Sequence, residues 1–292
     1  MHTDIATYDR HIAEMIPAQA SSDEQMIAIW INRSGSPRTR RNYLTWAARF
    51  LAFSGKTLSQ VTVGDLQAFG QSITDRAPAS QALAISSIKS LLTTAYELGF
   101  IRFNPGKAIK APAVKRTLAE RILSESDVQR MLHLEPDPRN RALLTLVYAA
   151  GLRVSEATGL HWRDLQARDN RGQVTVVGKG SKTRAVLLSA GVWEMLQALP
   201  QAGKDEPVFK SRKGGTLDAS AVHRVVKAAA QRAGINAETS CHWLRHAHAS
   251  HALDRGAPIH LVQQTLGHRS VATTGIYLHA RPNESSGLFL AV

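Results

Sequence analysis

A single stretch, residues 172–188, breaks the helical spacing of apolar side chains that runs along most of this 292-residue chain. Val174 and Val176 recur there at a spacing of two, the turn GKGS follows, and the apolar run AVLL returns. A spacing of two is typical of a β-strand, and glycines on both sides of a lysine favour a turn. We therefore expect a small β-hairpin with a cationic tip inside a mainly α, α+β chain.

The first ~110 residues predict helices only, because their apolar residues recur at helical spacing. Ser36-Pro37 is a helix start signal, and Gly99 is a stop signal. The expected helices cover residues 18–30, 36–51, 62–69 and 79–98. Further helices are expected at residues 140–150, 191–199, 218–233, 242–254 and 259–266.

Between these helical regions, residues 107–122 hold five cations and one acid. Such a segment predicts an extended basic linker, which could lie along a polyanion or form a solvated tether. We therefore expect three parts. They are a helical domain at residues 18–106, the linker at 107–122, and a second domain at 123–292.

The net charge of +13 favours a polyanionic partner, because phosphate contacts release counterions. Both parts are basic: residues 1–112 carry 12 basic and 8 acidic residues, and residues 113–292 carry 24 and 15. Cys241 is the only cysteine, which excludes an internal disulfide and a multi-cysteine zinc site. The sequence shows no membrane span and no secretory signal, so a cytosolic protein is expected.

Two cations have chemically marked surroundings. Arg153 follows an apolar helix in the string GLRVSE, and its planar guanidinium suits two oxygens of one phosphate. An ion pair with Glu156 is the structural alternative. Lys179, at the hairpin tip, could donate a proton to a leaving hydroxyl. A solvated turn lysine is the alternative there, with Lys182 and Arg184 as rival cations.

Downstream, the spacing of four residues is informative. His242 and Arg245 are three apart at the start of a predicted helix, so they share one face. His268 follows Leu-Gly, and Tyr277 comes nine residues later. A phenol has a pKa of about 10, so a tyrosine nucleophile needs cationic surroundings. The arginines would supply them.

The same helix is rich in other histidines: His246, His248 and His251. We expect these to be packing or surface residues. A zinc site between His242 and His246 is disfavoured, because Trp243 stands where a metalloprotease motif has glutamate. We expect neither a metal nor another cofactor.

The strings GLRVSE, GKGSK, HWLRH and LGHRS, followed by a late tyrosine, resemble the tyrosine site-specific recombinases, the family of phage integrases and Xer recombinases. The resemblance is tight over residues 123–280 and looser over 18–110. It implies an all-helical core-binding domain and a C-terminal catalytic domain that form a clamp around DNA. No separate arm-binding domain is evident before residue 18, which favours a two-domain, Xer-like plan.

The resemblance assigns six catalytic positions. Two arginines clamp the scissile phosphate, a lysine and a histidine handle protons, and a second histidine either hydrogen-bonds the phosphate or helps orient the nucleophile. The tyrosine attacks phosphorus and forms a 3′-phosphotyrosyl link without metal or ATP. In chain order these residues are Arg153, Lys179, His242, Arg245, His268 and Tyr277.

The resemblance also implies site-specific recombination of double-stranded DNA by a homotetramer, with dimers on each site, in a bacterial-type, nucleoid-associated cytoplasmic location. The target sequence, the genetic element served, an accessory protein and docking of the C-terminal tail in cis or in trans stay open. Phosphate contacts are expected from Arg38, Arg40, Arg41, Lys115 and Arg116.

Three alternatives use the same residues differently. A type IB topoisomerase would cut with the tyrosine without exchanging partners, a DNA-binding regulator would not cut, and a metalloenzyme would use the histidines. A regulator needs no nucleophile, so the filled set of six positions favours an enzyme. Partner exchange, a covalent adduct and metal analysis distinguish these classes.

Overall fold

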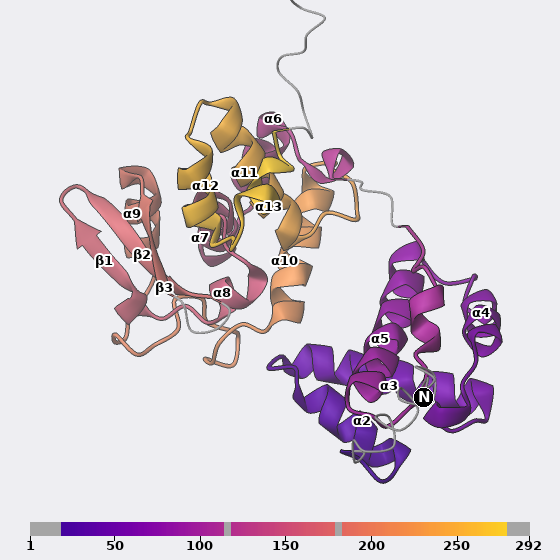
Figure 1. Ribbon diagram of the computed structural model, residues 1–292. Coiled ribbons are helices and arrows are strands. Elements are labelled where there is room, and N and C mark those ends of the chain that lie inside the picture. Colours follow the sequence, from indigo (N-terminus) through magenta and orange to yellow (C-terminus); the bar gives the residue numbers. More distant parts are fainter. Residues whose placement is uncertain (1–18, 114–117, 179–182, 279–292) are drawn as a thin grey trace, which may run out of the picture. The chain divides into compact units, whose positions relative to one another are not determined.

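The computed structural model describes residues 19–113, 118–178 and 183–278 (Figure 1). The chain divides into two compact units between residues 116 and 117. The fold is mainly helical with one small sheet, which confirms the predicted class. The three-part division at residues 18–106, 107–122 and 123–292 stays a prediction. Within the described residues, no helix is long and apolar enough to cross a membrane.

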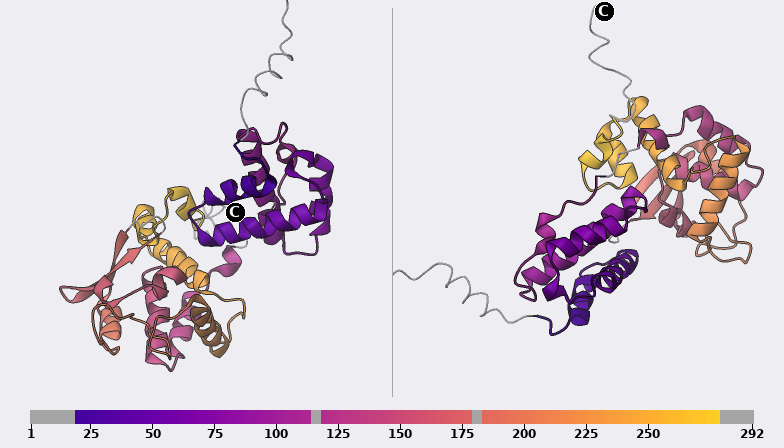
Figure 2. Two further views of the ribbon diagram at one scale, coloured as in Figure 1. Left: turned by 90° about the horizontal axis from the view of Figure 1, so that it is seen from below. Right: turned by 90° about the vertical axis from the view of Figure 1, so that its right-hand side faces the viewer.

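Helices account for all the regular structure described in the first unit, as both views in Figure 2 illustrate. Ser22 caps the first of them, so this helix begins at Asp23 rather than near residue 18. Ser36 caps the next, with Pro37 in its first turn as predicted. The elements are α2 (Asp23–Asn32), α3 (Pro37–Ser54), η1 (Leu58–Gln60), α4 (Val63–Ser72), α5 (Pro78–Glu97) and η2 (Pro105–Ala108).

The core of the first unit lies along α5, which buries Ile88 and Leu91 completely. Leu83 of the same helix is 42% exposed, whereas the adjacent Ala84 and Ile85 are buried, so Leu83 lies on the side of α5 away from the core. Ile109 and Ala111, from the segment predicted as linker, pack against this core. The beginning of the basic segment is therefore tied to the first unit.

The second unit combines a small three-stranded sheet with helices that pack around α11. Its helical elements before the sheet are η3 (Ala119–Arg121), α6 (Glu125–His133), α7 (Pro138–Ala149), α8 (Val154–Thr158) and η4 (Trp162–Asp164). Those after it are α9 (Ala190–Gln197), α10 (Ala219–Arg232), α11 (Cys241–Asp254), α12 (Ile259–Leu266) and α13 (Val271–Gly275). Helix α11 packs against α7, α12, α6 and α10, and so becomes the framework of the unit.

The sheet contains the predicted hairpin and one further strand. Strands β1 (Leu165–Arg168), β2 (Arg171–Val177) and β3 (Thr183–Leu188) are antiparallel in the order β1-β2-β3. Val174 lies opposite Val186, and both face the core. Strand β1 escapes sequence analysis because only Leu165 among its four residues is buried, which leaves no alternation to detect. Helix α9 packs on β2.

Candidate active site

The turn after α7 fixes the position of Arg153. Gly151 has φ = +59°, a conformation that L side chains rarely adopt. A Cβ atom there would lie 2.8 Å from Cδ2 of Leu266 and 2.9 Å from Cδ2 of His248. The chain can therefore turn sharply against α11 and α12, and Arg153 emerges at the N-terminus of α8.

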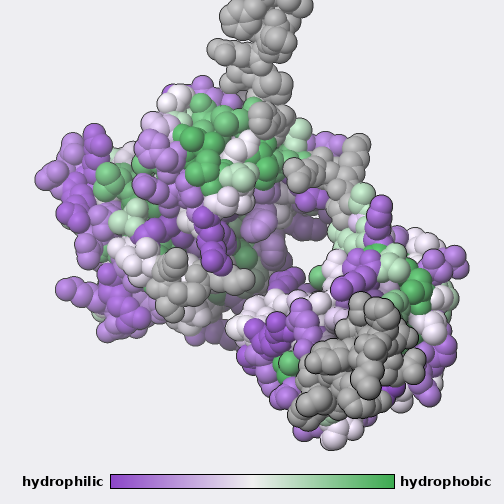
Figure 3. All heavy atoms as spheres, in the orientation of Figure 1, coloured by the Kyte–Doolittle hydropathy of each residue, from purple (hydrophilic) through white to green (hydrophobic). Residues whose placement is uncertain are grey.

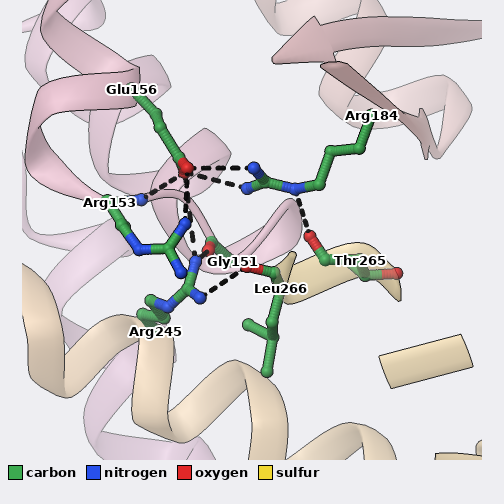
Figure 4. A network of polar contacts seen from close by, with 7 residues as sticks. All are labelled: Gly151, Arg153, Glu156, Arg184, Arg245, Thr265 and Leu266. Carbon is green, nitrogen blue, oxygen red and sulfur yellow. Dashed lines mark hydrogen bonds and ion pairs between the residues drawn. The ribbon is translucent and has the colours of Figure 1, made fainter. Parts of the chain in front are cut away.

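Glu156 is the anion around which three arginines gather (Figure 4). Arg153 donates to it twice: the backbone N–H lies 2.8 Å from Oε2, and Nη1 lies 2.7 Å from Oε1. Arg184 donates one hydrogen bond to Glu156 from each Nη atom, from Nη1 to Oε1 at 2.9 Å and from Nη2 to Oε2 at 2.8 Å. Nη1 of Arg245 is 3.9 Å from Oε2. The ion pair considered for Arg153 is therefore present, and it fixes the position of the guanidinium.

The charge of Glu156 is firmly held. Burial raises the pKa of this carboxyl, but hydrogen bonds from Arg184 and Arg153 more than offset that effect and lower it to about 2. Arg184 was a rival for the cation at the hairpin tip. Instead it is largely buried, and its Nε donates to the carbonyl of Thr265 at 2.6 Å. It therefore joins β3, α8 and α12 rather than projecting from the tip.

Arg245 is a buried cation, with only 4% of its surface exposed. It donates to the carbonyl of Gly151 and, at 2.6 Å, to that of Leu266. Burial and the nearby Arg153 lower the pKa of its guanidinium to about 10, so it remains charged at neutral pH. The side chain consequently locks the turn before Arg153 to the end of α12, and it adds positive potential between them.

Two predicted histidines lie beside these cations. His242 is exposed, but partial desolvation lowers its pKa, and the charges of Arg245 and Arg153 lower it further. The same causes, with Arg184 added, lower the pKa of His268 to about 4. Both imidazoles are therefore neutral near pH 7. Helix α12 ends at Leu266, the end expected from the sequence, and Gly267 caps it in the left-handed conformation.

Tyr277 follows α13 and is 4% exposed. Burial raises the pKa of its phenol, although Arg245 and Arg153 act in the opposite direction. Its ring is nearly parallel to that of His268, with centroids 6.5 Å apart and an interplanar angle of 6°. Nδ1 of His268 lies 2.9 Å from Oγ1 of Thr274, a hydrogen bond that fixes the imidazole beside the phenol.

Two of the three additional histidines of α11 are packing residues, as expected, and the third contacts Tyr277. His248 and His251 are packing residues: the first bonds the carbonyl of Tyr148 at 2.7 Å, and the second bonds the hydroxyl of Tyr148 at 2.9 Å. His246, however, has Nδ1 2.8 Å from Oη of Tyr277. This contact was not predicted, and the signal for it in the sequence is the place of His246 one helical turn after His242.

The second unit brings together Arg153, His242, Arg245, His268 and Tyr277. Both arginines lie near enough to lower the pKa values of the two histidines and to act on that of the tyrosine. Lys179, the sixth predicted residue, lies outside the described residues. The described residues contain no group of three or more His, Cys, Asp or Glu side chains able to hold a metal ion.

The residues predicted to contact DNA phosphates lie in the first unit or outside the described ranges. Arg38, Arg40 and Arg41 are exposed in the first turns of α3, and Nε of Arg40 donates to the carbonyl of Ser34 at 2.6 Å. Lys115 and Arg116 are not among the described residues. The neighbouring aromatic residues are packed: Trp46 is buried, and Tyr43 stacks on Trp30 with ring centroids 4.3 Å apart.

Comparison with known proteins gives consistent matches over both units. Residues 121–284 match the phage integrase family, and residues 24–97 match the phage integrase N-terminal SAM-like domain. Tyrosine recombinase XerC of Xylella fastidiosa strain M23 is 34% identical over 262 residues, covering 85% of this chain and 88% of that protein. Tyrosine recombinase XerD of Neisseria meningitidis serogroup A is 32% identical over 274 residues, covering 88% and 92%.

Solved structures show the same fold. A lambda integrase dimer bound to a COC′ core site matches with a TM-score of 0.74 and 20% identity, covering 97% of this chain and 83% of that one. XerH recombinase bound to its difH substrate matches with a TM-score of 0.69 and 21% identity, covering 98% and 88%.

Proposed function

We propose which residues of this chain carry out its reaction, given that it belongs to the phage integrase family and is a tyrosine recombinase that catalyses site-specific DNA recombination. Family membership selects the recombinase over the type IB topoisomerase and the DNA-binding regulator. The proposed catalytic residues are Arg153, Lys179, His242, Arg245, His268 and Tyr277.

The observation that carries this proposal is the position of the Tyr277 phenol near two cations that stabilise negative charge on its oxygen. The charges of Arg245 and Arg153 both act to lower the pKa of this phenol. About a third of the Arg153 side chain is exposed, at 32%, so a phosphate can approach its guanidinium. Fixed cations that meet the charge developing on a pentacoordinate phosphorus are usually the largest contribution to such catalysis.

In the proposed reaction, the oxygen of Tyr277 forms a bond to phosphorus while the bond from phosphorus to the 5′ oxygen breaks. The products are a 3′-phosphotyrosyl link and a free 5′-hydroxyl, and Lys179 supplies the proton of the leaving hydroxyl. His242 and His268, neutral near pH 7, hydrogen-bond the phosphate or assist its proton transfers. The covalent link conserves the bond energy, so a second 5′-hydroxyl can reverse the reaction without ATP.

We further propose double-stranded DNA as the partner, bound by a homotetramer with a dimer on each site. The charge of +13 and the DNA-bound structures of XerH and lambda integrase support the first part. Hydrophobic residues gather over α12 and α13 (Figure 3), where Leu261, Val271 and Leu278 are about half exposed, and this surface supports contact between subunits. A nucleoid-associated location in a bacterial cytoplasm belongs to the same proposal.

Covalent trapping tests the proposed reaction. Incubation with nicked DNA that carries the native flanking sequence, in EDTA, is expected to give an adduct on a denaturing gel. Proteolysis and mass spectrometry are expected to map the linkage to Tyr277 at a DNA 3′ end. An adduct at another residue, an adduct that requires divalent metal, or DNA binding with no adduct on cognate sites would contradict the proposal.

The salt dependence of DNA binding tests the first-unit contacts. Replacing Arg38, Arg40 and Arg41 together with glutamine is expected to lower the slope of log K against log [salt] by up to about 2.7, or roughly 0.9 for each lost phosphate contact. Arg102→Gln removes one exposed charge from the same unit and serves as a control. If Arg102→Gln lowers the slope by a third as much as the triple variant, the effect is general charge and the three contacts are not specific.

A further inference from the structure

Tyr277 has a hydrogen-bond partner of its own, His246 on α11, beside the arginines that gather at Glu156. The phenol oxygen lies 2.8 Å from Nδ1 of His246, and the ring centroids are 5.7 Å apart. Apolar side chains enclose the tyrosine, namely Ile122, Ala249, Val262 and Leu266. The phenol is therefore largely shielded from water, whereas His246 is partly buried.

The protonation states favour donation from the phenol to the imidazole. Burial raises the pKa of Tyr277, so the phenol keeps its proton at neutral pH. Burial lowers the pKa of His246 to about 4, and electrostatic interaction with neighbouring side chains, Arg245 and Arg121 among them, acts in the same direction. His246 is therefore a neutral imidazole, which can accept a hydrogen bond at one ring nitrogen.

The other histidines near Tyr277 are engaged differently. His268 lies parallel to the phenol ring at 6.5 Å, and its Nδ1 bonds Thr274. The ring centroid of His242 is 5.8 Å from that of His246, on the preceding turn of α11. Of these three imidazoles, His246 is the one that has a hydrogen bond to the phenol oxygen.

We propose that His246 is the catalytic proton acceptor for Tyr277. This inference rests on the proposed function, in which Tyr277 is the nucleophile. As the phenol oxygen bonds to phosphorus, its proton moves to Nδ1 of His246. The bond from phosphorus to the 5′ oxygen breaks, and that oxygen takes a proton from the separate leaving-group acid, assigned above to Lys179. In rejoining, His246 returns the proton as the tyrosine leaves.

Transfer from a nucleophile to a neighbouring imidazole also explains how a buried phenol can act. A phenol whose pKa is raised above 10 gives a negligible fraction of phenolate at neutral pH. As its oxygen bonds to phosphorus, however, the phenol proton becomes strongly acidic. A weakly basic imidazole at hydrogen-bond distance can then accept it in the transition state. With the two rings 5.7 Å apart, attack by Tyr277 can therefore proceed without prior ionisation of the phenol.

Two substitutions separate proton transfer from mere positioning. In His246→Asn the amide lies near the former Nδ1 and can still hydrogen-bond the phenol, but it cannot take a proton. In His246→Gln the amide lies farther along the side chain, near the former Nε2. We expect both variants to form the DNA adduct about 10²–10⁴-fold more slowly than wild type on the suicide substrate. Near-wild-type cleavage by His246→Asn would mean that a hydrogen bond alone suffices, and would overturn the proposal.

A less basic nucleophile provides a second readout that a structural role would not give. Fluorine in 3-fluorotyrosine lowers the pKa of the phenol, so attack depends less on an acceptor. We expect 3-fluorotyrosine at position 277 to raise the cleavage rate of His246→Asn by a larger factor than that of wild type. An equal factor in both proteins would contradict proton acceptance by His246.

His251→Asn is the matched control, since it removes another buried imidazole from α11. His251 bonds the hydroxyl of Tyr148 and the carbonyl of Leu123, not Tyr277. We expect its cleavage rate per DNA-bound protein to stay within about twofold of wild type. Tyr277→Phe is run alongside: adduct formation by this variant would refute the nucleophile itself. Loss of the adduct in Tyr277→Phe, with wild-type cleavage by His246→Asn, would refute only the role of His246.

Discussion

Tyr277→Phe is expected to abolish covalent attachment to DNA, lowering the cleavage rate by more than about 10³-fold, because the variant has no nucleophilic oxygen. The fold should persist, since phenylalanine fills the same apolar surroundings of Tyr277, which is 4% exposed. The lost hydrogen bond to His246 should cost only about 1 kcal/mol. Cleavage on a nicked substrate and thermal melting measure the two effects.

Tyr148→Phe is the matched control for this prediction. Tyr148 is partly buried. Its hydroxyl, like that of Tyr277, bonds an imidazole of α11, with Oη 2.9 Å from Nδ1 of His251. A similar loss of stability is expected, but cleavage per folded protein should remain within about twofold of wild type. Equal losses of cleavage in both variants would assign the effect of Tyr277→Phe to folding, contrary to the expected result.

Glu156→Gln is expected to give the largest loss of stability. The carboxylate is 7% exposed and accepts hydrogen bonds from Arg153 and Arg184, with Arg245 3.9 Å away. A neutral amide leaves these guanidinium groups without a counter-charge. Its NH₂ also replaces one acceptor with a donor. Breaking a buried ion pair in this way costs about 3–5 kcal/mol. In a unit of this size the melting temperature should fall by roughly 6–20 °C.

Cleavage should fall as well, by about 10–100-fold per folded protein, because Arg153 and Arg245 lose the anion that positions them. Glu135→Gln is the control: Glu135 is 2% exposed and pairs with Arg232, away from the proposed catalytic residues. It should lower stability without this further loss of cleavage. If both variants cleave equally well per folded protein, Glu156 has no positioning role.

The contribution of Glu156 should depend on pH in a defined direction. Its pKa is about 2 in the folded protein, below the ordinary value of 4.5. Its stabilising effect is therefore fully present above about pH 4.5 and is lost as the pH falls toward 2. The difference in unfolding free energy between wild type and Glu156→Gln should shrink across this range, as urea titrations can measure. A difference that grows below pH 4.5 would contradict this assignment.

Patterns within a few residues carried most of the predicted fold. The Ser36-Pro37 start of α3 and the Gly267 end of α12 depend on neighbouring backbone atoms, so both are visible in the sequence. The hairpin of β2 and β3 was visible as a spacing of two, although the register that pairs Val174 with Val186 comes from the structure. Strand β1 could not be predicted, because its pairing with β2 stabilises a segment that has no apolar alternation of its own.

The amino-acid sequence alone determined the helical and strand periods and the local strings around the five proposed catalytic residues in the described ranges. It offered the pairing of Arg153 with Glu156, three residues away, as one of two alternatives, and the structure shows that pair. Only the tertiary structure decided that Arg184 shares the same carboxylate, that Arg245 joins Gly151 to Leu266, and that His246 meets Tyr277. The reason is physical. Local hydrogen bonds and periodicity depend on adjacent residues, whereas burial and the partner of a charge depend on segments that meet only after the chain has packed.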